Sequence, residues 1–126
     1  MLSVWIVDDD DEMSHAVQLM LQLLDCSVTR YRDARSAAQD LLSGKKPEAM
    51  ILDINMPEVS GIDLLEFLRM REEFQSIPIV MLSSETTDIQ VDEALKIGAD
   101  AFVFKPVTIE ELEEALAKAV QSRKRA

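Results

Sequence analysis

Two hydrophobic periodicities alternate along this chain of 126 residues, and the alternation constrains its fold more strongly than any other feature. Short apolar runs typical of strands are separated by amphipathic patterns with the period of a helix. The expected strands are Ser3–Val7, Ser27–Tyr31, Ala49–Ile54, Ile77–Leu82 and Ala101–Phe104. The expected helices cover Met13–Leu24, Ala37–Leu42, Ile62–Met70, Ile89–Ile97 and Leu112–Val120. Strands that alternate with helices predict an α/β fold with a parallel sheet.

The polarity of the strands indicates their order in the sheet. Four of them are nearly all apolar, as is typical of strands that helices cover on both faces. The strand Ser27–Tyr31 contains Thr29 and Arg30 and therefore suits an edge. We expect a doubly wound sheet of five parallel strands in the order 2-1-3-4-5, with helices on both faces. The functional site should lie at the switch point between the first and third strands.

Local signals mark several helix ends. Ser, Thr and Asp are favoured N-caps, a Glu or Gln three residues later completes a capping box, and Gly ends helices. The candidate caps are Asp33, Thr87 with Gln90, and Thr108 with Glu111, and the candidate stops are Gly44 and Gly98.

Length and charge restrict the functions that are open to the chain. We expect one domain over residues 1–121, followed at 122–126 by a basic tail or the start of a linker. The formal net charge is −11, and the only basic cluster is Arg123, Lys124 and Arg125. Nucleic-acid binding needs a basic surface, so we expect none here. No apolar run approaches the ~20 residues that span a bilayer, and the single cysteine, Cys26, excludes an internal disulfide, so we expect a cytoplasmic protein without membrane contact.

Residues able to carry chemistry follow the four apolar strands, whereas we expect nothing comparable from the edge strand. Because the carboxyl ends of parallel strands lie along one edge of a sheet, these side chains should meet. They are Asp8–Asp11 after the first strand, Asp53 and Asn55 at the end of the third, Ser83, Ser84 and Glu85 after the fourth, and Lys105 with Pro106 after the fifth.

Such a cluster suits a metal ion and phosphoryl chemistry. Crowded carboxylates raise one another's pKa, and a divalent cation relieves this repulsion. Ligands that are all oxygen suit Mg²⁺, which keeps several waters and takes one or two carboxylates. A carboxylate beside a metal and a lysine can attack phosphorus to form an aspartyl phosphate. Because the transferring group carries spread negative charge, Mg²⁺ and Lys105 would neutralise it, and Ser83 would donate a hydrogen bond.

Five motifs stand in order at these strand ends. They are Asp8-Asp9, Asp53-x-Asn55-Met56-Pro57-x-x-x-Gly61, Ser83, Gly98-Ala99-x-x-Phe102 and Lys105-Pro106. Together they resemble the receiver domain of bacterial two-component response regulators, chemotaxis receivers included, from Val4 to about Val120. The resemblance implies a signalling switch, not an enzyme, that assists its own phosphotransfer and dephosphorylation.

The resemblance also implies partners and roles. A sensor histidine kinase or phosphotransfer protein would supply the phosphoryl group from a phosphohistidine, and a downstream output domain or protein would respond. Whether the chain is a stand-alone receiver or part of a longer regulator stays open. The implied roles are Asp53 as phosphoacceptor, Lys105 and Ser83 as its phosphoryl-binding partners, and Ser83 with Phe102 as the switch. The implied Mg²⁺ ligands are Asp9, Asp53 and the Asn55 carbonyl, with Asp8 acting more through water.

Several positions depart from the family pattern or vary within it. Ser84 stands where alanine is common, but it is still small. Phe102 lacks a hydroxyl, so its switching would depend on packing alone. Asp10 and Asp11 extend the acidic run and are expected to be solvated residues at the start of the first helix, favoured there by the helix dipole. Asn55 and Glu85 occupy positions that tune the lifetime of the phosphoryl group.

Three other functions fit the residues less well. A phosphohydrolase of the haloacid-dehalogenase pattern needs a second Asp two residues after the nucleophile, where this chain has Asn55. A flavin-binding module needs a phosphate-cradling loop after the first strand, where four aspartates would repel a phosphate. A degenerate receiver used only for docking normally loses the Asp or the Lys, and this chain retains both.

The turn after the fifth strand predicts a cis Lys105–Pro106 bond. Only residues 105–107 separate Phe104 from the expected cap Thr108, and within them the lysine must point toward Asp53 before the chain reverses. A cis proline makes such a tight turn, and this bond is usually cis in the family that the chain resembles. We expect the Met56–Pro57 bond to be trans because a longer loop follows it.

Overall fold

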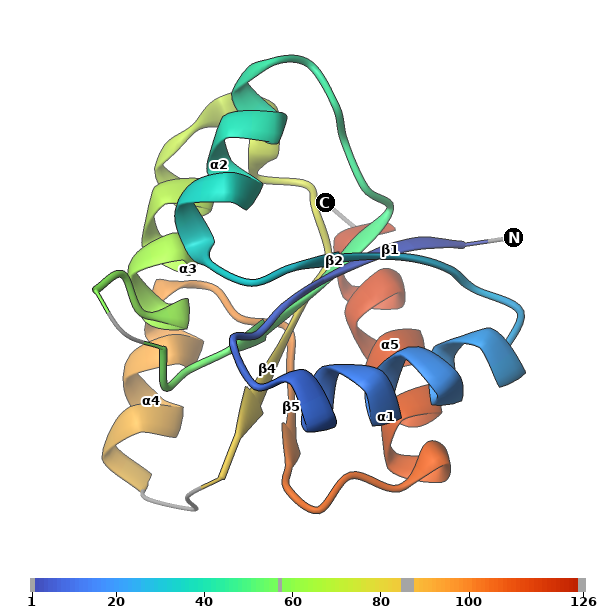
Figure 1. Cartoon of the computed structure of the whole chain (residues 1–126). Coiled ribbons are helices and arrows are strands. Elements are labelled where there is room, and N and C mark those ends of the chain that lie inside the picture. Colours follow the sequence, from blue (N-terminus) through green and yellow to red (C-terminus); the bar gives the residue numbers. More distant parts are fainter. Residues whose placement is uncertain (1, 57, 85–87, 125–126) are drawn as a thin grey trace.

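Five parallel strands form one sheet in the order β2-β1-β3-β4-β5 in the computed structural model, which describes residues 2–56, 58–84 and 88–124 (Figure 1). This confirms the predicted flavodoxin-like, doubly wound α/β fold, with Ser27–Tyr31 at an edge. The strands are β1 (Ser3–Val7), β2 (Ser27–Tyr31), β3 (Ala49–Asp53), β4 (Ile79–Ser83) and β5 (Ala101–Phe104). Strand β4 begins two residues later than expected because Pro78 has no N–H and the Ile77 N–H bonds to the Phe74 carbonyl in the preceding turn (3.2 Å).

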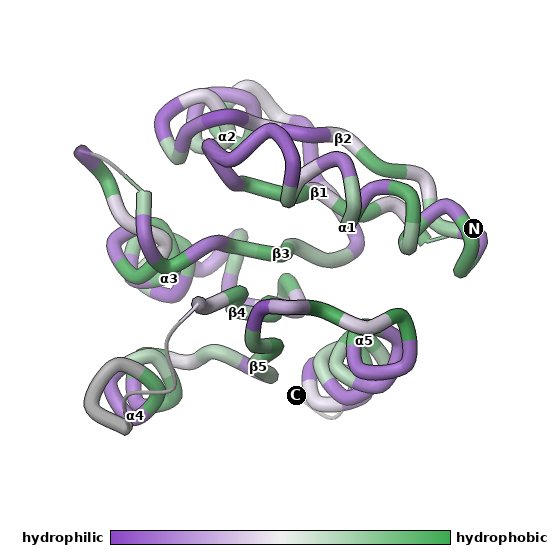
Figure 2. The backbone as a smooth tube through the Cα atoms, turned by 60° about the horizontal axis from the view of Figure 1, so that its bottom comes forward, coloured by the Kyte–Doolittle hydropathy of each residue, from purple (hydrophilic) through white to green (hydrophobic). Residues whose placement is uncertain are grey.

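Helices cover both faces of the sheet. They are α1 (Asp11–Leu23), α2 (Ala34–Leu42), α3 (Gly61–Met70), α4 (Asp88–Ile97) and α5 (Ile109–Lys124), with a 3₁₀ turn at Glu72–Phe74. Helices α1 and α5 lie against one face, and α2, α3 and α4 against the other (Figure 2). Successive residues of β1 point to opposite faces, so Val4 and Ile6 pack with α1 and α5, whereas Trp5 and Val7 pack on the other side.

The capping predictions that fall on described residues are confirmed. The Asp33 carboxylate accepts the Ser36 N–H (2.7 Å), and the Thr108 hydroxyl accepts the Glu111 N–H (3.2 Å) while donating to its carboxylate (2.8 Å). Gly44 and Gly98 end their helices with φ values of 105° and 127°, which favour glycine. Thr87, Glu85 and the Met56–Pro57 bond lie outside the described residues.

Helix α5 runs to Lys124, beyond the Val120 of the periodic pattern, because Arg123 is anchored to the domain. Its Nε donates to Asp100 Oδ1 (2.8 Å), and the Arg69 guanidinium donates to the other oxygen (3.0 Å). The Asp100 side chain is 2% exposed, and its Oδ2 also accepts the Ile79 N–H (2.8 Å). Burial, followed by the nearby Arg123 cation, lowers the pKa of Arg69 to about 10. We name Arg69, Asp100 and Arg123 the buried clamp; it ties α3 and α5 to the sheet at the edge opposite the strand ends described next.

Candidate metal centre at the carboxyl edge of the sheet

The strand ends meet as the parallel topology predicts. The Lys105 N–H donates to the Ser83 carbonyl (2.8 Å), and the Ile54 N–H donates to the Leu82 carbonyl (3.0 Å). These bonds place the residues that follow β3, β4 and β5 side by side. One carboxylate oxygen each from Asp8, Asp9 and Asp53 lies within 4.8 Å of the others. The structure therefore brings together five residues that we selected from the sequence: Asp8, Asp9, Asp53, Ser83 and Lys105.

Asp53 ends β3 with its carboxylate almost fully enclosed. The residue is 2% exposed, its Oδ1 accepts the Asn55 N–H (3.2 Å), and its Oδ2 lies 3.7 Å from Lys105 Nζ. Burial raises the pKa of Asp53 to about 7, and the neighbouring Asp8 carboxylate adds to this rise, while Lys105 and the Asn55 N–H oppose it. Lys105 alone therefore does not offset the cost of burying the negative charge of Asp53 beside Asp8.

Asp8 supplies a direct test of whether a cation fits. It is fully buried, and its Oδ1 accepts the Asp10 N–H (2.9 Å). Its Oδ2 is buried and accepts no hydrogen bond from the residues that the structure describes. Such an oxygen is costly unless something pairs with it. A hard cation held by Asp9 and Asp53, together with the water that it keeps, would supply a partner for this oxygen, so the residues present fit Mg²⁺.

The run of four aspartates divides into two functional pairs. Asp10 is the N-cap of α1 and accepts the Met13 N–H (3.1 Å). Asp11 forms ion pairs with Arg30 (2.8 Å) and Arg32 (2.9 Å), and its hydrogen bond with Arg30 is the main cause of its lowered pKa. Asp10 and Asp11 are thus engaged at the start of α1, as expected, and Asp8 and Asp9 lie beside the Asp53 carboxylate.

The edge strand β2 contacts the acidic loop after β1, which the sequence did not suggest. Arg30 of β2 reaches across to the loop after β1, where its Nε and Nη2 donate to the Asp8 carbonyl (3.2 and 2.9 Å). This contact with the backbone of the acidic loop was not predicted from the sequence. The available signal was an arginine near the end of a short strand, but its target depends on the pairing register, which places Ile6 opposite Arg30.

Gly61 lets α3 begin directly beside Asp53. Its N–H donates to the Ile54 carbonyl (3.2 Å), and a Cβ built on it would collide with the Asp53 carbonyl oxygen. Only glycine fits this approach without a shift of backbone. The glycine of the Asp53 motif is thus explained by the packing of a helix N-terminus on the end of β3.

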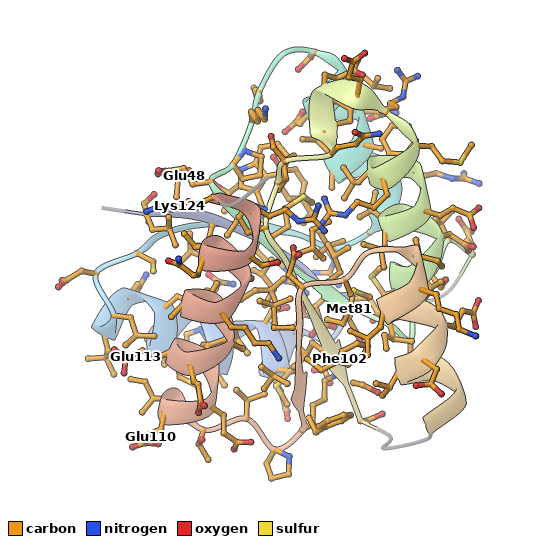
Figure 3. All side chains as sticks on the ribbon, turned by 180° about the vertical axis from the view of Figure 1, so that it is seen from behind. Glu48, Met81, Phe102, Glu110, Glu113 and Lys124 are labelled. Carbon is orange, nitrogen blue, oxygen red and sulfur yellow. The ribbon has the colours of Figure 1, made fainter. Side chains whose placement is uncertain are left out.

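The remaining site residues surround this centre. Ser83 is 1% exposed at the end of β4, and the Asn55 side chain donates to the Ser84 hydroxyl (3.5 Å). Phe102 lies half-buried on β5, between α4 and α5, and stacks on Phe104 with ring centroids 6.0 Å apart (Figure 3). A groove of about 220 Å³ beside it is lined in part by Glu111 and Lys118 of α5. The Lys105–Pro106 bond is cis, as predicted.

Fold and site together define a doubly wound protein with a cluster of three aspartates, which fits a cation, beside a lysine at its switch point. Residues 4–117 match the family described as the response regulator receiver domain. The chain belongs to this family: it is a receiver domain of two-component response regulators, a phosphoryl-accepting signalling switch.

Individual relatives agree with this assignment. The chain is 32% identical over 117 residues to chemotaxis protein CheY-3 of Vibrio cholerae serotype O1. This match covers 93% of this chain and 90% of that protein. It is 31% identical to the two-component response regulator ARR7 of Arabidopsis thaliana, over 86% of this chain and 57% of that protein. The solved structure of Vibrio cholerae CheY4 superposes with a TM-score of 0.85 at 29% identity, covering 94% of this chain and 98% of that one. Relatives thus occur in both bacteria and a plant. Among the described residues, no helix is long and apolar enough to cross a membrane.

Proposed function

We propose that Asp53 is the residue that accepts the phosphoryl group. The observation that carries this proposal is the position of its enclosed carboxylate, 3.7 Å from Lys105 Nζ and within the cluster formed with Asp8 and Asp9. An oxygen of Asp53 attacks the phosphorus, the P–N bond of a donor phosphohistidine breaks, and the histidine nitrogen keeps the electron pair and takes up a proton. Lys105 neutralises negative charge on the transferred group, and the Ser83 hydroxyl donates a hydrogen bond to one of its oxygens.

The metal of this centre is Mg²⁺ in our proposal. Asp9, Asp53 and the Asn55 carbonyl would hold it, with Asp8 acting more through water. A bound Mg²⁺ supplies positive charge next to the phosphoryl oxygens and the acceptor carboxylate. The buried Asp8 Oδ2 and the raised pKa of Asp53 support a cation at this position. By the same chemistry the domain assists its own phosphorylation and, with a water as nucleophile, its own dephosphorylation.

The conformational change that follows phosphorylation would occur on the neighbouring face of the molecule. Ser83 would turn toward the phosphoryl group, and Phe102 would move inward from its half-buried position. This population shift would be recognised by a downstream output domain or protein, and the donor would be a sensor histidine kinase or a phosphotransfer protein. We place the protein in the cytoplasm.

Phosphorylation from a small donor tests the proposal. The protein is incubated with phosphoramidate, with Mg²⁺ or with EDTA, and its intact mass is measured. We expect one phosphoryl adduct with Mg²⁺, little with EDTA, and a large loss in Asp9→Asn. Equal adduct formation in all three samples would rule out the metal-assisted site. His15→Gln, a change of an exposed residue on α1, is the control and should behave as the unmodified sequence does.

A further inference from the structure

Arg30 holds the backbone of the metal-binding loop from the edge strand. Its side chain is 19% exposed and makes three hydrogen bonds: two to the Asp8 carbonyl, at 3.2 and 2.9 Å, and one to Asp11 Oδ1 at 2.8 Å. The Asp8 N–H donates to the carbonyl of the next residue of β2, Tyr31 (3.0 Å). Both backbone polar groups of Asp8 are therefore fixed by two consecutive residues of β2.

This anchoring leaves Asp8 little freedom. Its backbone is held by β2, and its Oδ1 accepts the Asp10 N–H, while Asp10 itself caps α1. The Arg30 contact with Asp11 extends the same hold to the first residue of α1. The oxygen that remains without a hydrogen bond among the described residues is the buried Oδ2, and one carboxylate oxygen of Asp8 lies within 4.8 Å of oxygens of Asp9 and Asp53.

We propose that Arg30 is a positioning residue for the cation site: it fixes the loop of Asp8 and Asp9 before the cation binds and thereby raises the affinity for Mg²⁺. This inference rests on the proposed function. The loss of a residue that orients metal ligands typically weakens metal binding about 10- to 100-fold. Because Arg30 holds the loop through a backbone carbonyl, we expect the lower end of this range.

The positive charge of Arg30 acts in the opposite direction, because a cation near the site repels Mg²⁺. Its guanidinium is paired with Asp11 at 2.8 Å, and such a pair close to solvent is screened by salt. We therefore expect the positioning effect to exceed the repulsion. The two effects predict opposite changes in affinity when Arg30 is replaced, so a binding measurement separates them.

Calorimetric titration with Mg²⁺ compares the unmodified protein with Arg30→Met, Arg30→Lys and Arg32→Met. Arg32 is the matched control: it pairs with the same Asp11 carboxylate at 2.9 Å, but its side chain is 66% exposed. We expect Arg30→Met to raise the Kd for Mg²⁺ about 10-fold. Arg30→Lys should raise it similarly, because lysine keeps the charge and loses the planar fork. Arg32→Met should change it by less than about twofold.

The outcomes separate this inference from the proposed function. Unchanged or tighter binding in both Arg30 variants, or equal weakening in Arg32→Met, would overturn the positioning role. If the unmodified protein binds no Mg²⁺, or if Asp9→Asn binds it equally well, the cation site itself is wrong and the inference is lost with it. Thermal unfolding in EDTA monitors the fold. Should Arg30→Met not fold, Arg30→Lys decides, because charge alone predicts no change in it.

Discussion

At the scale of single residues, the burial of Asp53 beside Asp8 disfavours its negatively charged form. Its pKa of about 7 in the folded protein exceeds the ordinary value of 3.8, because the carboxyl is buried next to Asp8. Between these two values the folded protein binds a proton that the unfolded chain has already released. Without metal, the free energy of unfolding should therefore fall as the pH rises from about 4 to about 7, and then level off with respect to this group.

Asp53→Asn removes this charge and should stabilise the metal-free protein. At pH 8 in EDTA we expect the variant to gain about 2 kcal/mol in the free energy of unfolding, measured by urea denaturation. At pH 5, where the Asp53 carboxyl is largely protonated in the folded state, the gain should shrink. Mg²⁺ should stabilise the unmodified protein and have much less effect on the variant. A gain that does not depend on pH would contradict the burial of a charged carboxylate as its cause.

At the scale of elements, the buried clamp fixes α3 and α5 on the sheet. Asp100 joins two arginines, and the Arg69 side chain is only 8% exposed. Removal of one partner of a buried pair leaves an uncompensated charge and costs about 3 to 5 kcal/mol. We expect Asp100→Asn to lower the free energy of unfolding by about 3 kcal/mol in urea denaturation. Asp92→Asn, the same change at an exposed position of α4, should cost little; equal losses would show that the clamp does not stabilise the fold.

The same elements show which contacts sequence patterns can predict and which they cannot. Apolar runs and helical periodicity predicted the sheet order, and because parallel strand ends share an edge, they also placed Asp8, Asp53 and Lys105 together. Arg30 was missed since its reach depends on the pairing of β2 with β1. The clamp was missed for a similar reason: Arg69, Asp100 and Arg123 meet only after α3 and α5 dock on the sheet. Contacts of this kind follow from the packing of several elements, and no local pattern encodes them.

At the scale of the whole molecule, phosphorylation at one edge should change a face formed by α4, β5 and α5. Ser83 and Phe102 lie on adjacent strands, β4 and β5, and Phe102 has a groove beside it. We expect beryllofluoride, which mimics the phosphoryl group, to change amide hydrogen exchange in α4, β5 and α5. Changes confined to α1 and α2 would defeat this expectation.

A symmetric dimer through this face is not expected. In the family that the chain resembles, the DNA-binding subgroup typically places an arginine on α5, where this chain has Ala115, which is buried. Size-exclusion chromatography with light scattering, with and without beryllofluoride, should therefore report one unchanged mass. A doubled mass in beryllofluoride would contradict this expectation.

The central claim is that Asp53 carries the phosphoryl group, and chemical mapping of that group tests it most directly. Protein phosphorylated in the presence of Mg²⁺ is reduced with borohydride, which converts an aspartyl phosphate to homoserine, and is then digested and sequenced by mass spectrometry. We predict homoserine at position 53 of the phosphorylated protein, and none there in unphosphorylated protein or in Asp53→Asn. Homoserine at position 8 or 9 instead of 53, or a phosphoryl adduct that persists undiminished in Asp53→Asn, would contradict the account.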